Sequence, residues 1–341
     1  MWIPDFKVNN RTLGLLEKIA ELRSKIQESS IRLPWVPSLV RDAMVKSVHG
    51  STAIEGCTLS IEAVENLFEG KKVSGYPENH IRMAKNYIDA IRWITKNEKE
   101  PVISENNIKK LHSIIAAGAV DDGIIGEYRK IDVRAGIYSA PPWRKIPGMM
   151  KEFVDWLNNK SKDIPAVFTS SLIHLQFVNI HPFQDSNGRC ARALATWELY
   201  RRGFDTLHIF SLDEVLLENR NLYIKNLQRV QIEKYPLGAW LEFMSETILE
   251  TLKRLYSRIL STGITTNTQI SLTLKQEKLL RTIQEQGIMG IQDIAKTIKT
   301  TIPGAHYVLK PLIKSGIIVI TGRHKTVKYA IPSMIKKSES E

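Results

Sequence analysis

Residues 181–192 read His181-Pro-Phe-Gln-Asp-Ser-Asn-Gly-Arg-Cys-Ala-Arg192, and they lie between two apolar runs with helical periodicity, 166–180 and 191–200. This pattern predicts a loop between two helices, with the second helix opening at Asn187-Gly188. The first turn of a helix exposes unpaired N–H groups and the positive end of the helix dipole, which together bind phosphate. The stretch therefore predicts an anion site between two helices.

The side chains of this stretch supply the groups that transfer from a nucleotide requires. Arg189 and Arg192 are three residues apart, so their guanidiniums share one helix face and can fork onto phosphate oxygens. The carboxylate of Asp185 is a hard oxygen ligand suited to Mg²⁺ that also touches a phosphate. The imidazole of His181 can take a proton near neutral pH. A base, a metal ligand and a phosphate site are thus predicted in one short segment.

The stretch resembles the signature of the Fic family, His-x-Phe-x-Asp/Glu-Gly-Asn-Gly-Arg-x-x-Arg, and departs from it only where Ser186 replaces glycine. Family members with an intact motif move AMP from ATP to a protein hydroxyl. The resemblance implies that His181 deprotonates a Ser, Thr or Tyr hydroxyl, that Asp185 holds Mg²⁺ and that Phe183 is buried. The residues implied to hold the nucleotide are Ser186, Asn187, Gly188, Arg189 and Arg192.

The serine at position 186 raises a question of backbone strain. Glycine there would accept a positive φ and let backbone N–H groups approach phosphate closely. A serine at positive φ would carry a strain of about 1–3 kcal/mol. If that geometry is kept, Ser186→Gly is predicted to tighten nucleotide binding or to raise the transfer rate.

Other interpretations of the motif stay open. One is a DNA-binding transcriptional regulator whose core senses nucleotide without turning it over. Another is an enzyme that transfers a different phosphate-containing group. The plainest is an ordinary loop between helices, with a histidine at the helix end and solvent-exposed arginines.

A second motif, Ser51-Thr-Ala-Ile-Glu55-Gly56, lies upstream. By itself it predicts the end of a helix, expected over about 38–49, followed by a turn. It also resembles the inhibitory motif of the Fic family, Ser/Thr-x-x-x-Glu-Gly/Asn, whose glutamate pairs with the second arginine of the signature. The resemblance implies that Ser51, Glu55 and Gly56 form an inhibitory segment, in which Glu55 pairs with Arg192 and displaces the γ-phosphate of ATP.

Residues 131–137 alternate between apolar and polar side chains, and Tyr138-Ser-Ala-Pro-Pro142 follows. This pattern predicts a short β-hairpin that ends at 138–142. It resembles the flap of Fic proteins, which lies over the active site and holds the target segment as an added strand. A solvated structural hairpin is the alternative. His112, on the apolar face of a helix that ends at Ile115, is interpreted as a core residue.

Residues 272–332 follow a different plan. Helices are predicted at 274–286, 291–297 and 301–315, and strands at 316–321 and 326–330, which is the order of a winged helix-turn-helix. From 272 to the end, twelve lysines and arginines face five carboxylates. The third helix could enter a major groove, with Arg323, His324 and Lys325 near phosphates. Winged helices also bind proteins, so both partners stay open.

We therefore predict a mostly α protein built around a Fic helical core with a short β-hairpin flap and a C-terminal winged helix-turn-helix domain. The expected division is a helical regulatory segment with the inhibitory motif at 1–100, the Fic catalytic core at 101–260, a linker at 261–271, the winged helix domain at 272–332 and a polar tail at 333–341.

Composition narrows the class of protein. With 341 residues, 43% of them hydrophobic, the chain is ordinary for a globular protein of two or three domains. The formal net charge of +12 favours an anionic partner, and nucleotide and nucleic acid both qualify. Cys57 and Cys190 give no disulfide framework, and no long apolar run is present, so a cytoplasmic protein without a membrane partner is expected. The partners considered are ATP, a protein target that includes the chain itself, DNA and a second copy in a homodimer.

Overall fold

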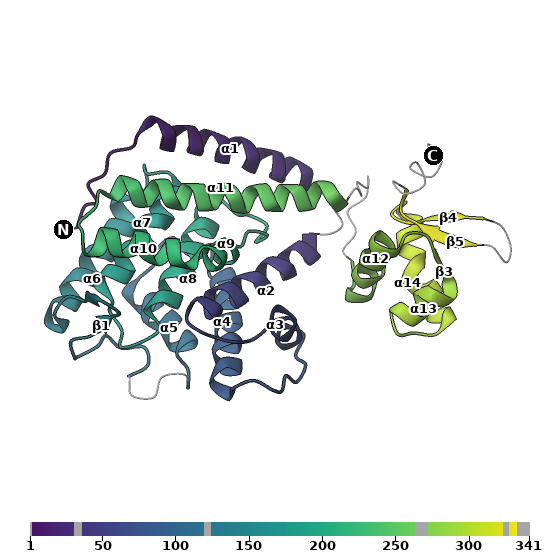
Figure 1. Ribbon diagram of the computed structural model, residues 1–341, viewed down its shortest axis with the longest axis horizontal. Coiled ribbons are helices and arrows are strands. Elements are labelled where there is room, and N and C mark those ends of the chain that lie inside the picture. The colour runs from purple at the N-terminus through teal and green to yellow at the C-terminus, as the bar shows by residue number, and fades with distance from the viewer. Residues whose placement is uncertain (1, 31–35, 119–123, 263–271, 323–326, 333–341) are drawn as a thin grey trace. The chain divides into compact units, whose positions relative to one another are not determined.

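The protein, described by a computed structural model, is mostly helical, as the sequence predicts (Figure 1). The described residues are 2–30, 36–118, 124–262, 272–322 and 327–332. The chain divides into two units. The core unit contains Met1–Ala20 and Asp42–Leu252, and the tail unit contains Glu21–Arg41 and Lys253–Glu341.

Some predictions fall outside the described residues. They concern most of the linker 261–271, the wing tip with Arg323, His324 and Lys325, and the polar tail 333–341. Within the described ranges, no helix is long and apolar enough to cross a membrane.

The helices α7 (Ala166–Ile180) and α8 (Asn187–Arg201) pack against each other in the core unit. Both are buried around most of their circumference. The hydroxyl of Ser171 donates to the Val167 carbonyl one turn earlier, so this polar side chain is satisfied inside its own helix. The predicted loop between two helices is confirmed, and α8 opens at Asn187 as expected.

The core unit contains further helices, several of which pack against this pair. They are α3 (Ile61–Phe68), α4 (Glu78–Lys96), α5 (Glu105–Ile115), α6 (Ile146–Asp155), α9 (Leu212–Glu218) and α10 (Arg220–Gln231), with the short η1 (Trp143–Lys145) and the π-helical η2 (Trp156–Lys160). Three helices contribute residues to both units: α1 (Asn10–Ser30), α2 (Val36–Ile54) and α11 (Leu237–Thr262).

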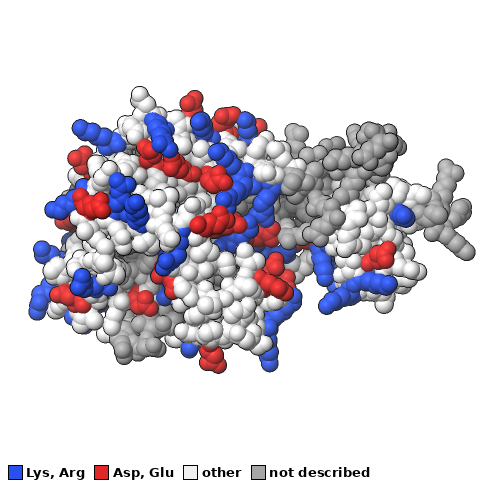
Figure 2. All heavy atoms as spheres, in the orientation of Figure 1, with Lys and Arg blue, Asp and Glu red and all other residues white. Residues whose placement is uncertain are grey.

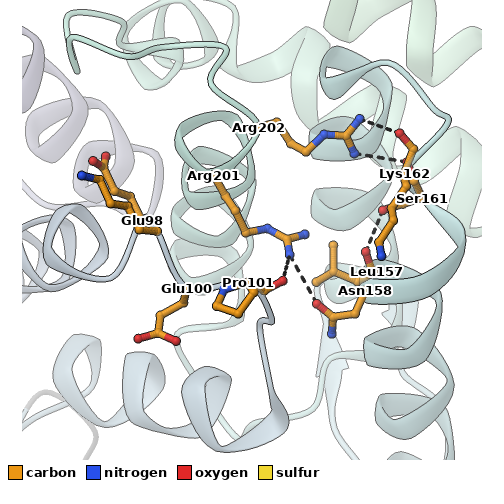
Figure 3. Close-up of a pocket in the computed structure, with 10 residues that line it drawn as sticks. Glu98, Glu100, Pro101, Leu157, Asn158, Ser161, Lys162, Arg201 and Arg202 are labelled. Atoms are coloured by element: carbon orange, nitrogen blue, oxygen red, sulfur yellow. Dashed lines mark hydrogen bonds between the residues drawn. The ribbon is translucent and has the colours of Figure 1, made fainter.

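Two arginines fix the C-terminal end of α8 (Figure 3). Arg201 donates from Nη1 to the Pro101 carbonyl at 3.0 Å and to Asn158 Oδ1 at 3.4 Å. Arg202 donates from Nη2 to the Lys162 carbonyl at 2.9 Å. These side chains line a pocket of about 330 Å³, but their N–H groups are spent on protein oxygens. They therefore hold the C-terminal end of α8 in place.

The predicted end of the helix near residue 49 is wrong. Helix α2 continues through Gly50 to Ile54. A Cβ atom at Gly50 would lie 2.5 Å from the carbonyl oxygen of Asp213, so the glycine serves close packing and does not end the helix. The inhibitory motif therefore spans the last turn of α2 and the turn that follows it.

The hairpin is present but shorter than predicted. Strands β1 (Arg134–Ala135) and β2 (Tyr138–Ser139) pair antiparallel, with Ala135 opposite Tyr138. The turn falls at Gly136-Ile137, where Gly136 has a φ of 59°. Tyr138 therefore belongs to the second strand and does not end the hairpin, which corrects the sequence prediction.

The described part of the tail unit holds α12 (Leu274–Gln286), β3 (Met289–Gly290), α13 (Ile291–Thr297), α14 (Ile302–Lys314), β4 (Val319–Thr321) and β5 (Lys328–Ala330). The strands form an antiparallel sheet in the order β3-β5-β4. The predicted helices are found within one residue of their expected bounds. Strand β3 was not predicted, because two residues are too short to show a period. The winged helix assignment itself stays a prediction.

Candidate active site

The loop between α7 and α8 turns sharply through two left-handed residues. His181 ends α7 with a φ of 51°, and Ser186 precedes α8 with a φ of 63°. Inside the loop, Asn187 Oδ1 accepts from the Phe183 backbone N–H at 3.0 Å, and its Nδ2 donates to the Phe183 carbonyl at 2.8 Å. The side chain of Asn187 therefore shapes the loop, and only its backbone is left for a phosphate.

A second histidine, His112, packs against this loop. The ring of His112 stacks on the fully buried Phe183, with ring centroids 3.7 Å apart. Its Nδ1 accepts from the Gly126 backbone N–H at 2.9 Å, so Nε2 carries the proton and donates to the Asp185 carbonyl at 3.3 Å. Burial lowers the pKa of His112 to about 4. The prediction of a core histidine is confirmed, but its contact with the loop was not foreseen.

His181 lies half-buried at the wall of a pocket. Its Nδ1 is 3.3 Å from the Val178 carbonyl, and this contact assigns the ring proton to Nδ1. Nε2 is then the basic atom. Burial, with the nearby charge of Arg129, lowers the pKa of His181. The imidazole is therefore neutral at pH 7, which is the form a general base needs.

Arg129, which the sequence analysis missed, ties the hairpin to this loop. The buried guanidinium donates from Nε to the His181 carbonyl at 2.8 Å, from Nη1 to the Ile131 carbonyl at 2.7 Å and from Nη2 to the Pro141 carbonyl. Because it binds carbonyls on both sides of the hairpin, it holds the two ends of the hairpin together. The only sequence signal was an arginine just before the predicted hairpin.

The pocket beside His181 has a volume of about 600 Å³. Its walls come from Glu55 after α2, the hairpin, the loop 181–186, the first turn of α8 and one side of α10. Its lining cations are Arg134, Arg192, Arg220 and Lys225, against the carboxylates Glu55 and Asp185. On the face of the core unit in Figure 2, Lys and Arg alternate with Asp and Glu. The excess of cations in the pocket, beside a helix N-terminus, suits a polyphosphate.

Asp185 is the residue in this pocket that fits Mg²⁺. Its side chain is 54% exposed, so a carboxylate oxygen is open to the pocket. No cluster of three or more His, Cys, Asp or Glu side chains suited to a metal occurs in the described ranges. Mg²⁺ commonly binds through one or two carboxylates with phosphate oxygens and water, so a single aspartate beside a phosphate site is a sufficient protein ligand.

Arg192 is nearly surrounded by protein oxygens. It is 3% exposed, its Nε donates to Ser51 Oγ at 2.8 Å, and its Nη2 donates to the Ser51 carbonyl at 2.8 Å and to Glu55 Oε1 at 2.7 Å. Burial disfavours the charged guanidinium of Arg192. The nearby Glu55, with Asp213 and two tyrosines, outweighs this effect and raises the pKa of Arg192. The structure thus brings Arg192 together with Glu55, the pair that the motif resemblance implied, and with Ser51 of the same motif.

Two further partners of Arg192 come from the segment after α8, and the sequence analysis missed both. The buried Asp213 places Oδ1 3.5 Å from Arg192 Nε, and the Tyr223 hydroxyl is 3.4 Å from Nη1. Burial raises the pKa of Asp213 although Arg192 and Ser47 oppose it. No local pattern marks either residue, because their role depends on where α9 and α10 fold.

The carboxylate of Glu55 lies over the first turn of α8. A Cβ atom at Gly188 would be 2.4 Å from Glu55 Oε1, so only glycine leaves room for this approach. Burial works to raise the pKa of Glu55, but Arg192, with Arg189 and Arg220, outweighs it and lowers the pKa. Arg220 also donates to the Ile54 carbonyl at 2.9 Å and holds the end of α2. An ionised carboxylate therefore sits where a phosphate would bind α8.

Part of the chain matches a known family model. Residues 102–199 match the model of the Fic/DOC family. This segment, the Fic region, contains His181, Asp185 and Arg192, but Glu55 lies upstream of it.

Curated relatives called protein adenylyltransferase Fic align with a longer part of the chain. The relative from Drosophila willistoni is 31% identical over 205 residues, which cover 58% of this chain and 39% of the relative. The relative from Aedes aegypti is 30% identical over 172 residues, which cover 48% of this chain and 34% of the relative. The chain thus spans well under half the length of these relatives.

Solved structures support the fold. A Fic family protein from Desulfovibrio desulfuricans G20 is 23% identical, with a TM-score of 0.68, and the match covers 97% of this chain and 98% of that one. Fic-1 from C. elegans is 21% identical, with a TM-score of 0.62, and the match covers 74% of this chain and 73% of that one. A Fic helical fold, as the sequence predicted, is confirmed.

Proposed function

We propose that this chain transfers AMP from ATP to a Ser, Thr or Tyr hydroxyl of a protein. The observation that carries the proposal is the neutral imidazole of His181 beside a cationic pocket at the N-terminus of α8. The relatives named protein adenylyltransferase support the same reaction class. In this proposal the Fic region supplies the general base and the phosphate site, and Glu55, which lies outside that region, inhibits the transfer.

In this reaction the hydroxyl oxygen of the target attacks the α-phosphorus of ATP. His181 Nε2 takes the hydroxyl proton, the bond from the α-phosphorus to the bridging oxygen breaks, and pyrophosphate leaves. Backbone N–H groups at Gly188 and the guanidiniums of Arg189 and Arg192 bind the phosphates. Mg²⁺, held by Asp185 with phosphate oxygens, would neutralise charge on the leaving pyrophosphate. Positioning and charge neutralisation supply most of the acceleration.

Labelled ATP separates this reaction from its rivals. The Glu55→Gly variant, freed of the carboxylate over α8, is incubated with Mg²⁺ and ATP labelled at either the α- or the γ-phosphate. AMP transfer places only the α-label on protein, whether on the chain itself or on an added target. Label from the γ-phosphate would indicate phosphoryl transfer. ATP binding without any labelled protein would indicate a nucleotide sensor.

The tail unit favours duplex DNA as a second partner. The solvent side of α14 carries His306, Tyr307, Lys310 and Lys314, and Tyr307 is 81% exposed. A helix with lysines and an exposed aromatic ring has the chemistry for phosphate contacts in a groove. Regulation of transcription by a nucleotide-sensing protein remains the alternative function. A homodimer and a cytoplasmic location stay predictions from the sequence.

DNA binding by α14 is expected to weaken steeply with salt. In a filter-binding series on the full chain, replacing Lys310 and Lys314 by Gln should reduce the slope of log K against log[salt] by about 2, since each phosphate contact contributes about 1. The matched control replaces the exposed Lys85 and Lys151 of the core unit by Gln. Equal slopes for the two double variants, or no retention at low salt, would leave α14 as a protein-binding surface.

A further inference from the structure

The hydroxyl of Ser186 makes a contact that glycine at this position cannot make. Ser186 is 4% exposed and holds a left-handed conformation, with φ 63° and ψ 11°. Serine is a favoured helix N-cap, yet this side chain makes no cap hydrogen bond to α8. Its Oγ instead accepts from Arg189 Nη2 at 2.8 Å. The hydroxyl is thus directed at a specific charged partner.

Arg189 has few other places to direct its guanidinium. The residue is 3% exposed, and its Nε and Nη1 lack a hydrogen-bond partner among the described residues. The Asp185 carboxylate is within ion-pair distance, with Oδ2 3.6 Å from the same Nη2 that Ser186 holds. Asp185 Oδ1 accepts from the Ser186 backbone N–H. One guanidinium nitrogen therefore has two competing acceptors, a neutral hydroxyl and a carboxylate.

The stronger of the two acceptors is the carboxylate, because charged partners make the shorter and stronger hydrogen bonds. With glycine or alanine at 186, Nη2 would be left to close on Asp185 Oδ2. That pairing would occupy one of the two carboxylate oxygens that suit Mg²⁺. The present distance of 3.6 Å makes an ion pair but is longer than a hydrogen bond, so the hydroxyl holds the guanidinium short of a direct hydrogen bond to the carboxylate.

We propose that Ser186 is a positioning residue whose hydroxyl keeps Arg189 from hydrogen-bonding directly to Asp185, so that the carboxylate stays available to Mg²⁺ and the nucleotide. The inference rests on the proposed function, because it assigns Asp185 to the metal. It reverses the expectation from strain alone, because the hydroxyl is expected to contribute more to the site than the backbone strain removes. The carboxylate and guanidinium are the groups that act, and Ser186 acts through them.

The test compares Ser186→Ala, which keeps the Cβ and its strain but loses the hydroxyl, with Ser186→Gly, which loses both. All variants are made in the Glu55→Gly chain, and ATP affinity is measured by calorimetry with Mg²⁺ and again in EDTA. We expect both substitutions to weaken the affinity in Mg²⁺ by roughly tenfold, the size of one hydrogen bond to a charged group, and to leave the affinity in EDTA within about twofold. Melting temperatures identify any variant that fails to fold.

Arg189→Gln supplies the matched control, because it removes the guanidinium that would close on Asp185. In that background Ser186→Ala should change the Mg²⁺-dependent affinity by less than about twofold, since the interaction being measured is gone. Tighter binding by Ser186→Gly, or equal weakening in Mg²⁺ and EDTA, would overturn the inference. A Glu55→Gly parent that binds no ATP at all would instead overturn the proposed function, and this inference with it.

Discussion

His181→Ala is expected to lower AMP transfer by roughly 10²–10⁴-fold, the range that general base catalysis supplies. In the structure, Nδ1 of His181 faces the Val178 carbonyl, so Nε2 is the atom that can take the hydroxyl proton. The imidazole contributes no positive charge to the phosphate site, because it is neutral at pH 7. ATP affinity in the Glu55→Gly background should therefore stay within about twofold by calorimetry. Unchanged transfer would contradict the assignment of the base.

The pH dependence of transfer follows from the same pKa. Burial lowers the pKa of His181 below its ordinary value of 6.5, so the basic form dominates from pH 8 to 7. The rate should be flat over that interval and should fall only as pH drops through the lowered pKa. His306→Ala, which removes an exposed imidazole of the tail unit, serves as the control and should keep both the rate and the profile.

The parts of the fold that the sequence predicted well depend on local signals. Neighbouring residues encode each of these features: the apolar run 166–180, the change of pattern at His181 and the helix start at Asn187. These elements form as predicted because their tertiary contacts favour the same conformation as the local sequence does. The ion pair of Glu55 with Arg192 spans a long stretch of sequence, and only the resemblance of two motifs to a family made it predictable.

The parts that the sequence missed depend on contacts between distant segments. Arg129, Asp213 and Tyr223 carry no local pattern, and each becomes part of the site because a buried polar group must find a partner in the fold. The predicted end of α2 failed for the same kind of reason. The helix was expected to end near residue 49, but the lack of a side chain at Gly50 lets the helix pack against Asp213.

Ser186 shows how one observation can change the sign of a prediction. Ser186 adopts the positive φ that the glycine of the motif would tolerate, and strain alone would favour glycine. The hydrogen bond to Arg189 was invisible in the sequence, because a short polar side chain at a helix start is expected to cap the helix. Backbone geometry was therefore predictable, whereas the partner of the side chain was not.

Glu55→Gly is expected to raise AMP transfer, measured as self-labelling with α-labelled ATP and Mg²⁺, by about tenfold or more, the size of one charge-assisted contact. In the present structure Glu55 Oε1 receives a hydrogen bond from Arg192 at 2.7 Å and lies against Gly188. A γ-phosphate that approached Arg192 would find the guanidinium already paired and would be repelled by the negative charge of Glu55. Removing the carboxylate frees the guanidinium and opens the first turn of α8.

The pH range of this inhibition can also be stated. The pKa of Glu55 lies below its ordinary 4.5, so the carboxylate stays ionised and paired with Arg192 at every pH where transfer is measured. The pair is lost only as pH falls through the lowered pKa. Acidification from pH 8 to 5.5 should therefore not relieve the inhibition, and the ratio of variant to wild-type labelling should persist across that range.

A substitution at Arg192 tests whether the gain in AMP transfer comes from the freed guanidinium. Adding Arg192→Ala to Glu55→Gly should abolish the increase, because the phosphate site then lacks the group that Glu55 had occupied. Glu62→Ala, which removes an exposed glutamate of α3, is the control for loss of a negative charge and should label like the wild type. Equal self-labelling by the wild type and Glu55→Gly, with both folded and ATP saturating, would show that the carboxylate over α8 does not restrain the reaction.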